Sequence, residues 1–163
     1  MEIMGMIMTQ AFDGTTAWMV NPQTGVAEEM PEQMSEDMKK QAMGNTALLD
    51  PEKLGITYTY EGTEAIEGVE YVLLKQAFSD GDAVTYYIHP ETYLVYKTKG
   101  MGMNQMGVEV ETETFLSDYK EIDNSMVPYI ITIYQDGEEF MMITLAEYKY
   151  NSGLEDAFFQ MEK

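Results

Sequence analysis

The chain has 163 residues, of which 29 are acidic and 9 basic, and because every basic residue is a lysine its formal net charge at pH 7 is -20 with no arginine. Such a field repels phosphate groups, and bidentate arginine contacts to phosphate are unavailable, which argues against a nucleic-acid partner. The absence of cysteine excludes disulfides, thiolate nucleophiles and cysteine-ligated metal centres. No apolar run approaches the roughly 20 residues that span a bilayer. The first residues lack the basic region and cleavage site of a signal peptide. We therefore expect a chain that does not span a membrane and is either complete or part of a longer precursor.

The N-terminal part predicts a hairpin followed by a helix. Residues 3–8 and 17–20 have the composition of two short strands, joined through Asp13-Gly14. Residues 21–25 end this hairpin. Methionines then recur every fourth residue from Met30, with acidic residues early, lysines late and a proline at the start, as in an amphipathic helix. A second short helical turn is expected over 50–55.

From residue 56 onward the pattern predicts short strands separated by turn residues. The expected strands cover 56–60, 69–78, 83–89, 93–99, 109–121, 126–134 and 139–150. With the first hairpin this gives about nine strands, which favours an all-β antiparallel sheet over parallel βαβ units. A twisted sheet of this size curls, and we expect one domain over residues 1–163, an incomplete barrel plugged by the helical segment at about 31–54.

The order of several short motifs resembles the LolA-like outer membrane lipoprotein-sorting family. The likeness covers about residues 12–161 and is carried by Trp18, Asn21-Pro22-x-Thr24-Gly25, the following helix, His89-Pro90-Glu91-Thr92-Tyr93-Leu94, Leu116-Ser117-Asp118-Tyr119-Lys120-Glu121, Val127-Pro128, Asn151 and 154–159. The resemblance implies an incomplete antiparallel barrel closed by helices, an apolar cavity, a periplasmic or otherwise extracytoplasmic location and binding of acyl chains.

Three departures from the family pattern are informative. Only about seventeen residues precede Trp18, so the chain is N-terminally short relative to the family. Asn124-Ser125 occupies a turn where the family usually has glycine, and the arginine with which LolA carriers hold their closed state is missing. Because the N-terminal segment is short, we expect an uncovered sheet edge near residues 1–20, and exposed edges favour pairing with another chain. We therefore expect a homodimer or higher assembly through these N-terminal edge strands.

Sixteen methionines are the most unusual feature of the composition. Met4, Met6 and Met8 share one face of a strand, and Met101, Met103 and Met106 cluster among glycines. Methionine fills irregular spaces and adapts to apolar ligands, so core filling and ligand lining are both plausible roles. A soft thioether site for Cu(I) is the alternative, although no cysteine and a single histidine accompany the sulfurs.

Three other groups of residues have ordinary and functional interpretations. His89 precedes Pro90 at a strand end, where a hydrogen-bonded structural role is commoner than catalysis or metal binding. Glu109, Glu111 and Glu113 project from one strand face, either as a solvated surface or as ligands for Ca²⁺. The tyrosines on the strands either pack across the sheet or stack on sugars.

The sequence therefore predicts a non-enzymatic carrier or binding module for lipid acyl chains or other apolar ligands, without a cofactor or metal. Face parity and the helical stripe nominate ten cavity-lining residues: Met4, Met6, Met8, Trp18, Met34, Met38, Tyr71, Leu73, Tyr87 and Met142. A structural or assembly protein that self-associates through edge strands and a methionine-rich copper-handling protein are the alternatives.

Overall fold

The computed structural model describes residues 2–3, 6–7, 9–21, 23–43, 46–104, 108–150 and 152–161. Contacts along the chain divide it into two compact units. The first unit is formed by Met1–Asp50 together with Asn151–Lys163, and the second by Pro51–Tyr150. We predicted a single domain in which a helix plugs the barrel. Both predictions depend on how the two units are arranged, so they stay predictions.

The first unit contains short strands and the longest helix. Its elements are β1 (Glu2–Ile3), β2 (Met6–Ile7), β3 (Gln10–Phe12), β4 (Ala17–Val20), β5 (Ala27–Glu29), α1 (Glu32–Met43), α2 (Thr46–Leu49) and the 3₁₀ helix η2 (Asp156–Phe159). β1 pairs with β2, and β3, β4 and β5 form a three-stranded antiparallel sheet. Helix α1 contacts β3 and β4. The predicted helix is confirmed, and within its own unit it packs on the small sheet.

The first hairpin differs from its prediction. The strand that pairs with β4 is β3, over Gln10–Phe12, whereas Ile3 belongs to the separate β1–β2 pair. The reason lies in the turn, where Asp13 Oδ1 accepts hydrogen bonds from the backbone N–H groups of Thr15 and Thr16, at 2.9 and 2.7 Å. This side-chain cap makes a short turn at 13–16, so the residues that flank it pair with each other. The hairpin ends after Val20 as predicted, but the chain then turns back into β5, a strand that was not predicted.

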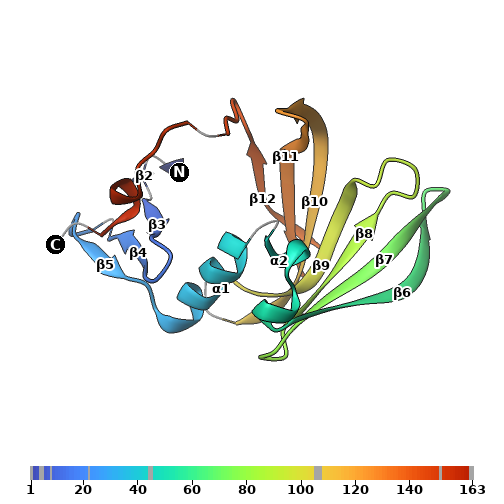
Figure 1. Ribbon diagram of the computed structural model, residues 1–163, viewed down its shortest axis with the longest axis horizontal. Helices are drawn as coiled ribbons and strands as arrows, with labels where there is room; N and C mark the ends of the chain where they lie inside the picture. The colour runs from blue at the N-terminus through green and yellow to red at the C-terminus, as the bar shows by residue number, and fades with distance from the viewer. Residues whose placement is uncertain are drawn as a thin grey trace. The chain divides into compact units, whose positions relative to one another are not determined.

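The second unit is one antiparallel meander. After the 3₁₀ helix η1 (Glu52–Leu54) come β6 (Ile56–Ile66), β7 (Val69–Phe78), β8 (Ala83–Ile88), β9 (Val95–Met103), β10 (Glu109–Ile122), β11 (Ser125–Gln135) and β12 (Glu138–Thr144). Each strand pairs with its neighbours in the chain, so the sheet order is β12-β11-β10-β9-β8-β7-β6. Figure 1 shows these strands side by side and twisted, with β6 and β12 at the two ends. The antiparallel sheet is open, which confirms the predicted all-β class and incomplete barrel.

Tight turns keep consecutive strands adjacent. Glu67-Gly68, Asp123-Asn124 and Asp136-Gly137 each place two residues at positive φ, between 48° and 88°. Two successive positive φ values characterise the two-residue turn whose twist matches that of flanking strands. At Asn124 the side chain tolerates the left-handed backbone that would otherwise favour glycine.

Several strand ends differ from their predictions. β6 runs on to Ile66 and β9 to Met103, beyond the predicted ends at 60 and 99. Tyr93 was placed at the start of a strand, but it has φ 58°, is 80% exposed and lies in a turn before β9. His89 explains this turn because its Nδ1 accepts hydrogen bonds from the backbone N–H groups of Glu91 and Thr92. The last predicted strand ends at Thr144 rather than at residue 150. No helix in the part of the chain that the structure describes is long and apolar enough to cross a membrane.

Candidate functional site

The pairing register divides the seven-stranded sheet into two chemically different faces. Residues paired across antiparallel strands project their side chains to the same face. One row across the sheet reads Leu73, Tyr87, Lys97, Phe115, Thr132 and Met142, and the adjacent row on the other face reads Leu74, Tyr86, Thr98, Thr114, Ile133 and Met141. We call the first the aromatic face and the second the apolar face.

The aromatic face is crossed by a series of ring contacts. Tyr71 contacts His89 edge-on and stacks on Tyr96, with ring centroids 5.8 and 4.6 Å apart. Tyr96 contacts Phe115, and Phe115 contacts Tyr134, with centroids 5.5 and 5.4 Å apart. Such offset and edge-to-face geometries stabilise a sheet beyond simple burial. Cross-strand packing, one of the two predicted roles of the tyrosines, is therefore present on this face.

Charged groups cover the middle of the aromatic face. Lys97 Nζ lies 2.6 Å from Glu113 Oε1, and 4.6 and 5.4 Å from the ring centres of Tyr87 and Phe115. Lys99 Nζ lies 2.9 Å from Glu111 Oε1. The glutamates predicted as a solvated face thus include two that pair with lysines on the neighbouring strand. Among the described residues, no group of three or more histidine and acidic side chains is arranged to hold a metal ion.

The apolar face is rich in branched aliphatic side chains. Most of its large members are half-buried: Val72, Leu74, Phe78, Val84, Ile88, Leu116, Ile131, Ile133, Met141 and Ile143. Val110 and Ile56 of the same face are buried. Covering the exposed part of these aliphatic side chains with an apolar ligand would remove it from water, which is favourable.

One polar row crosses this apolar face. It comprises Tyr58, Gln76, Val84, Gly100 and Thr112, each paired with the next. Gln76, only 5% exposed, donates from Nε2 to the Tyr58 hydroxyl at 2.7 Å and accepts from the Tyr86 hydroxyl at 2.9 Å. Burial raises the pKa of both Tyr58 and Tyr86 above the ordinary 10.0, so both phenols stay protonated at neutral pH.

Two glycines bring the strands around Thr112 unusually close. A Cβ on Gly100 would lie 2.9 Å from the carbonyl oxygen of Ala83, and one on Gly102 would lie 2.8 Å from Thr112 Oγ1. Strand glycines commonly mark such close approaches. Thr112 Oγ1 is buried and has no hydrogen-bond partner among the residues that the structure describes. Strand β9 therefore presents little side chain to the apolar face along this stretch.

The nominated residues of the second unit lie together on the aromatic face. Leu73, Tyr87 and Met142 belong to one row, and Tyr71 joins them through its contact with Tyr96. Tyr71 and Tyr87 are buried, whereas Met142 is 57% exposed at the sheet edge. That these four residues line a cavity stays a prediction.

The nominated residues of the first unit are more scattered. Trp18 is buried in β4, Met34 of α1 is exposed, and Met38 is half-buried. Met6 lies in β2, but its side chain is outside the description, and Met4 and Met8 lie outside the described residues. Their role as cavity lining is likewise still a prediction.

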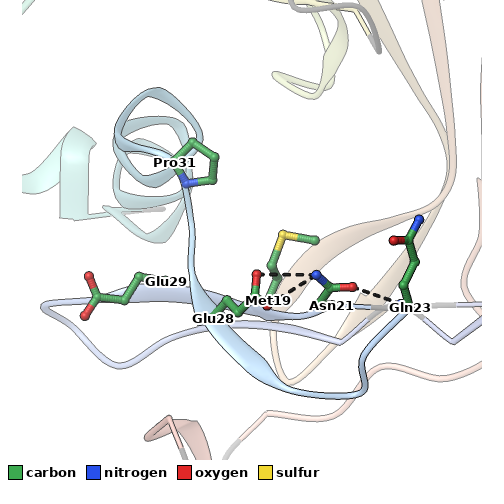
Figure 2. Close-up of a pocket in the computed structure, with 6 residues that line it drawn as sticks. All are labelled: Met19, Asn21, Gln23, Glu28, Glu29 and Pro31. Atoms are coloured by element: carbon green, nitrogen blue, oxygen red, sulfur yellow. Dashed lines mark hydrogen bonds between the residues drawn. The ribbon is translucent and has the colours of Figure 1, made fainter.

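A shallow hollow of about 380 Å³ lies at the β4–β5 hairpin. It is lined by Met19, Asn21, Gln23, Glu28, Glu29 and Pro31. Figure 2 shows Asn21 between Glu28 and Gln23, donating from Nδ2 to the carboxylate of Glu28 and accepting from the backbone N–H of Gln23. Four of the six lining residues carry a carboxylate or a carboxamide.

The second methionine cluster is only partly described. Met101 and Met103 lie on the same face of β9, paired with Glu111 and Glu109, and are 58% and 38% exposed. Met106 lies outside the described residues. Core filling, ligand contact and Cu(I) binding all stay predictions for this cluster.

Sequence reasoning overlooked the polar row. Gln76 and Thr112 were not singled out, although each is a polar residue at a strand position whose same-face neighbours, such as Leu74 and Val110, are apolar. Glycines inside a strand pattern were a second available signal, because they indicate close backbone approach. Both signals depend on assigning the correct face to each strand.

Comparisons with known proteins agree on the fold. No protein-family model matches the sequence, and no curated protein matches it. Among solved structures, a DUF1329 family protein from Desulfovibrio piger matches 89% of this chain and 62% of its own, with TM-score 0.63 and 18% identity. A structure described as an outer membrane lipoprotein-sorting protein domain from Vibrio parahaemolyticus matches 88% and 63%, with TM-score 0.58 and 13% identity.

A LolA superfamily protein from Nitrosomonas europaea matches 89% of this chain and 66% of its own, with TM-score 0.51 and 13% identity. The chain thus spans 62–66% of the length of these three structures. The resemblance seen in the sequence is confirmed at the level of the fold, which is LolA-like.

Proposed function

We propose that this protein is a non-enzymatic carrier or binding module that holds acyl chains of lipids or lipoproteins, or other apolar ligands, on the apolar face of its open sheet. The observation that carries the proposal is the row structure of that face, in which aliphatic side chains of β7, β8, β10, β11 and β12 are half-buried. Each methylene removed from water contributes about 0.8 kcal/mol. A chain of ten methylenes would therefore gain roughly 8 kcal/mol before the entropy cost of association.

The fold supports the same class of ligand and a location. One structure of similar fold is described as an outer membrane lipoprotein-sorting domain, and another as a LolA superfamily protein. We infer by analogy a periplasmic or otherwise extracytoplasmic location for this chain. Fold-level analogy alone does not fix a function, so the binding face itself must be tested.

Leu73 and Leu74 provide a matched test of the two faces. They are adjacent and both half-buried, but Leu73 pairs with Tyr87 on the aromatic face and Leu74 with Tyr86 on the apolar face. In a titration with a fluorescent fatty-acyl probe, we expect Leu74→Thr to weaken binding about tenfold, because it places a hydroxyl against the chain. Leu73→Thr should stay within about twofold of the parent protein.

The reverse result would contradict the apolar face as the binding surface and place the ligand beside Tyr71, Leu73, Tyr87 and Met142. Absence of probe binding to the parent protein would contradict the carrier function. The unfolding midpoint of each variant is measured alongside, so that loss of fold is not mistaken for loss of binding.

Self-association as a structural or assembly protein is the second candidate, and the observation that favours it is the edge strand β12. Phe140 and Met142 of β12 are 40% and 57% exposed, and the strand has neither lysine nor proline to discourage pairing. Both edge strands carry a bulge and two glutamates. In β6 these are the bulge between Tyr60 and Gly62 with Glu61 and Glu64, and in β12 the shift opposite Ile133 and Tyr134 with Glu138 and Glu139, so the exposed Phe140 and Met142 are what favour β12. Native mass spectrometry tests this candidate, because an oligomer abolished by Met142→Lys would support pairing through β12.

The same spectra test the remaining proposals. An oligomer that survives Met142→Lys would favour the N-terminal edge strands as the interface. A Cu(I) adduct lost on replacing Met101 and Met103 by leucine would favour the copper-handling alternative. Co-purified lipid would favour the carrier.

A further inference from the structure

Two hydrogen bonds on the apolar face link Tyr86, Gln76 and Tyr58, and they end at a hydroxyl group whose own proton is not used in either bond. The Tyr86 hydroxyl donates to Gln76 Oε1, and Gln76 Nε2 donates to the Tyr58 hydroxyl. A carboxamide that bonds two phenols through its oxygen and its nitrogen makes one phenol a donor and the other an acceptor. The accepting phenol keeps its own proton. In this structure that phenol is Tyr58, whose hydroxyl donates to no group among the described residues.

The surroundings of Tyr58 make its hydroxyl a hydrogen-bond donor that a ligand on the apolar face can use. Tyr58 is half-buried on β6, and its partner Gln76 lies between Leu74 and Phe78 on the same face of β7. A donor beside aliphatic groups that exclude water is costly to leave unpaired. A ligand that covered the apolar face without offering an acceptor would strip water from this hydroxyl. A ligand with an oxygen at that point would replace the lost bond.

The charges around the sheet favour an uncharged oxygen over a carboxylate. Lys75, Lys97, Lys99 and Lys120 each lie within 3.6 Å of a carboxylate oxygen of the chain itself. The formal net charge of -20 adds a field that repels anions. A phenol that stays neutral supplies a hydrogen bond but no compensating positive charge.

We propose that the Tyr58 hydroxyl binds the ester carbonyl oxygen of an acyl-chain ligand, so that the apolar face selects acyl esters over both fatty-acid anions and plain hydrocarbons. This inference rests on the proposed function of the apolar face and adds the chemistry of the ligand's polar end. The hydrocarbon lies on the aliphatic side chains of β7 and β8, and the ester lies at the polar row.

Competition binding tests the inference with three probes of equal chain length. Methyl palmitate, palmitate and hexadecane each displace a fluorescent acyl probe from the parent protein, Tyr58→Phe and Tyr60→Phe, at neutral pH. Tyr60 is the matched control because it occupies the next position on the same face of β6 but is 64% exposed. We expect the parent protein to prefer the ester to hexadecane by about fivefold or more, the scale of one hydrogen bond.

Tyr58→Phe should abolish that preference and tighten hexadecane binding, because it removes the donor that hexadecane leaves unpaired. Tyr60→Phe should preserve the preference. Tighter binding of palmitate than of its methyl ester would overturn the inference, as would an ester preference that survives Tyr58→Phe. Equal binding of the ester and hexadecane to the parent protein defeats this inference alone. Failure of all three to displace the probe defeats the proposed function itself.

Discussion

The indole Nε1 of Trp18 donates a hydrogen bond of 2.8 Å to the main-chain carbonyl of Phe159, 141 residues further along the chain. Trp18 is only 8% exposed and Phe159 is half-buried, so this bond is partly shielded from water. It joins β4 to the 3₁₀ helix η2 within the first unit. The first unit is therefore held together by segments that flank the whole of the second.

Trp18→Phe should loosen the segment that contains η2. The change removes the donor and leaves the Phe159 carbonyl without its partner, at an expected cost of about 2 kcal/mol. Hydrogen exchange of the backbone amides of Phe158 and Gln160, which donate within η2 and at its end, should become faster. Phe158→Ala is the control, because Phe158 is 68% exposed and its loss should leave the Gln160 amide nearly unaffected.

Glu113→Gln should destabilise the sheet more than Glu111→Gln. The side chains of Lys97 and Glu113 are 12% and 23% exposed, whereas those of Lys99 and Glu111 are 39% and 51% exposed. Removing the carboxylate charge of Glu113 leaves Lys97 poorly solvated between two rings, for which we expect about 2 kcal/mol. The exposed pair should contribute no more than about 0.5 kcal/mol. Urea denaturation measures both, and equal effects would contradict the assigned difference in burial.

Thr112→Val should stabilise the protein. Its Oγ1 is buried without a hydrogen-bond partner among the described residues, and valine replaces the hydroxyl by a methyl group of similar size. The expected gain is about 1 kcal/mol, at the low end of the cost of an unsatisfied buried hydroxyl. An increase in the urea midpoint with an unchanged slope would support this. A loss of stability would indicate that the hydroxyl has a partner.

Gly100→Ala should cost more stability than Gly102→Ala. The new Cβ at position 100 meets a backbone carbonyl oxygen at 2.9 Å, which moves only if β8 moves. At position 102 it meets the side-chain oxygen of Thr112, which can rotate away. We expect about 2 kcal/mol for the first change and about 1 kcal/mol or less for the second. Thermal unfolding of the two variants tests the order.

The protein should lose stability at alkaline pH because its phenols are buried. Burial raises the pKa of Tyr86 above the ordinary 10.0, and the nearby Tyr58 raises it further. A pKa that is higher in the folded than in the unfolded state means that folding favours the protonated phenol. The stabilisation is fully present below pH 10.0 and is lost as the pH rises through the folded-state value. Urea midpoints measured across this range should fall less steeply for Tyr86→Phe, and an identical slope would contradict the assignment.

The sheet was predictable because its turns carry local signals. Strand β7 was predicted over its observed range, since Gly68 before it and Asp80-Gly81 after it interrupt the alternation. The short strand β5 was missed because three residues carry too little periodicity to distinguish a strand from a loop. Tyr93 was misplaced because strand propensity favours tyrosine, whereas the His89 side chain dictates a turn there.

The candidate site was less predictable because it depends on register. Parity along one strand correctly separates Leu73 from Leu74, but it does not say which alternate set shares a face with the aliphatic residues of β10 and β11. Cross-strand pairing supplies that information by placing Tyr87 beside Lys97, and Tyr86 beside Thr98. Gln76 likewise acquires its role only when β6 and β8 bring two phenols to its carboxamide.

The discontinuous first unit has a consequence for the order of folding during synthesis. Residues 51–150, which form the meander, are contiguous in the chain. The small sheet around Trp18 emerges earlier but waits for the stretch that contains Phe159. The larger unit can therefore assemble from one continuous stretch, whereas the smaller one is completed only by residues that follow it in the chain, which reverses the N-to-C sequence in which successive domains usually mature.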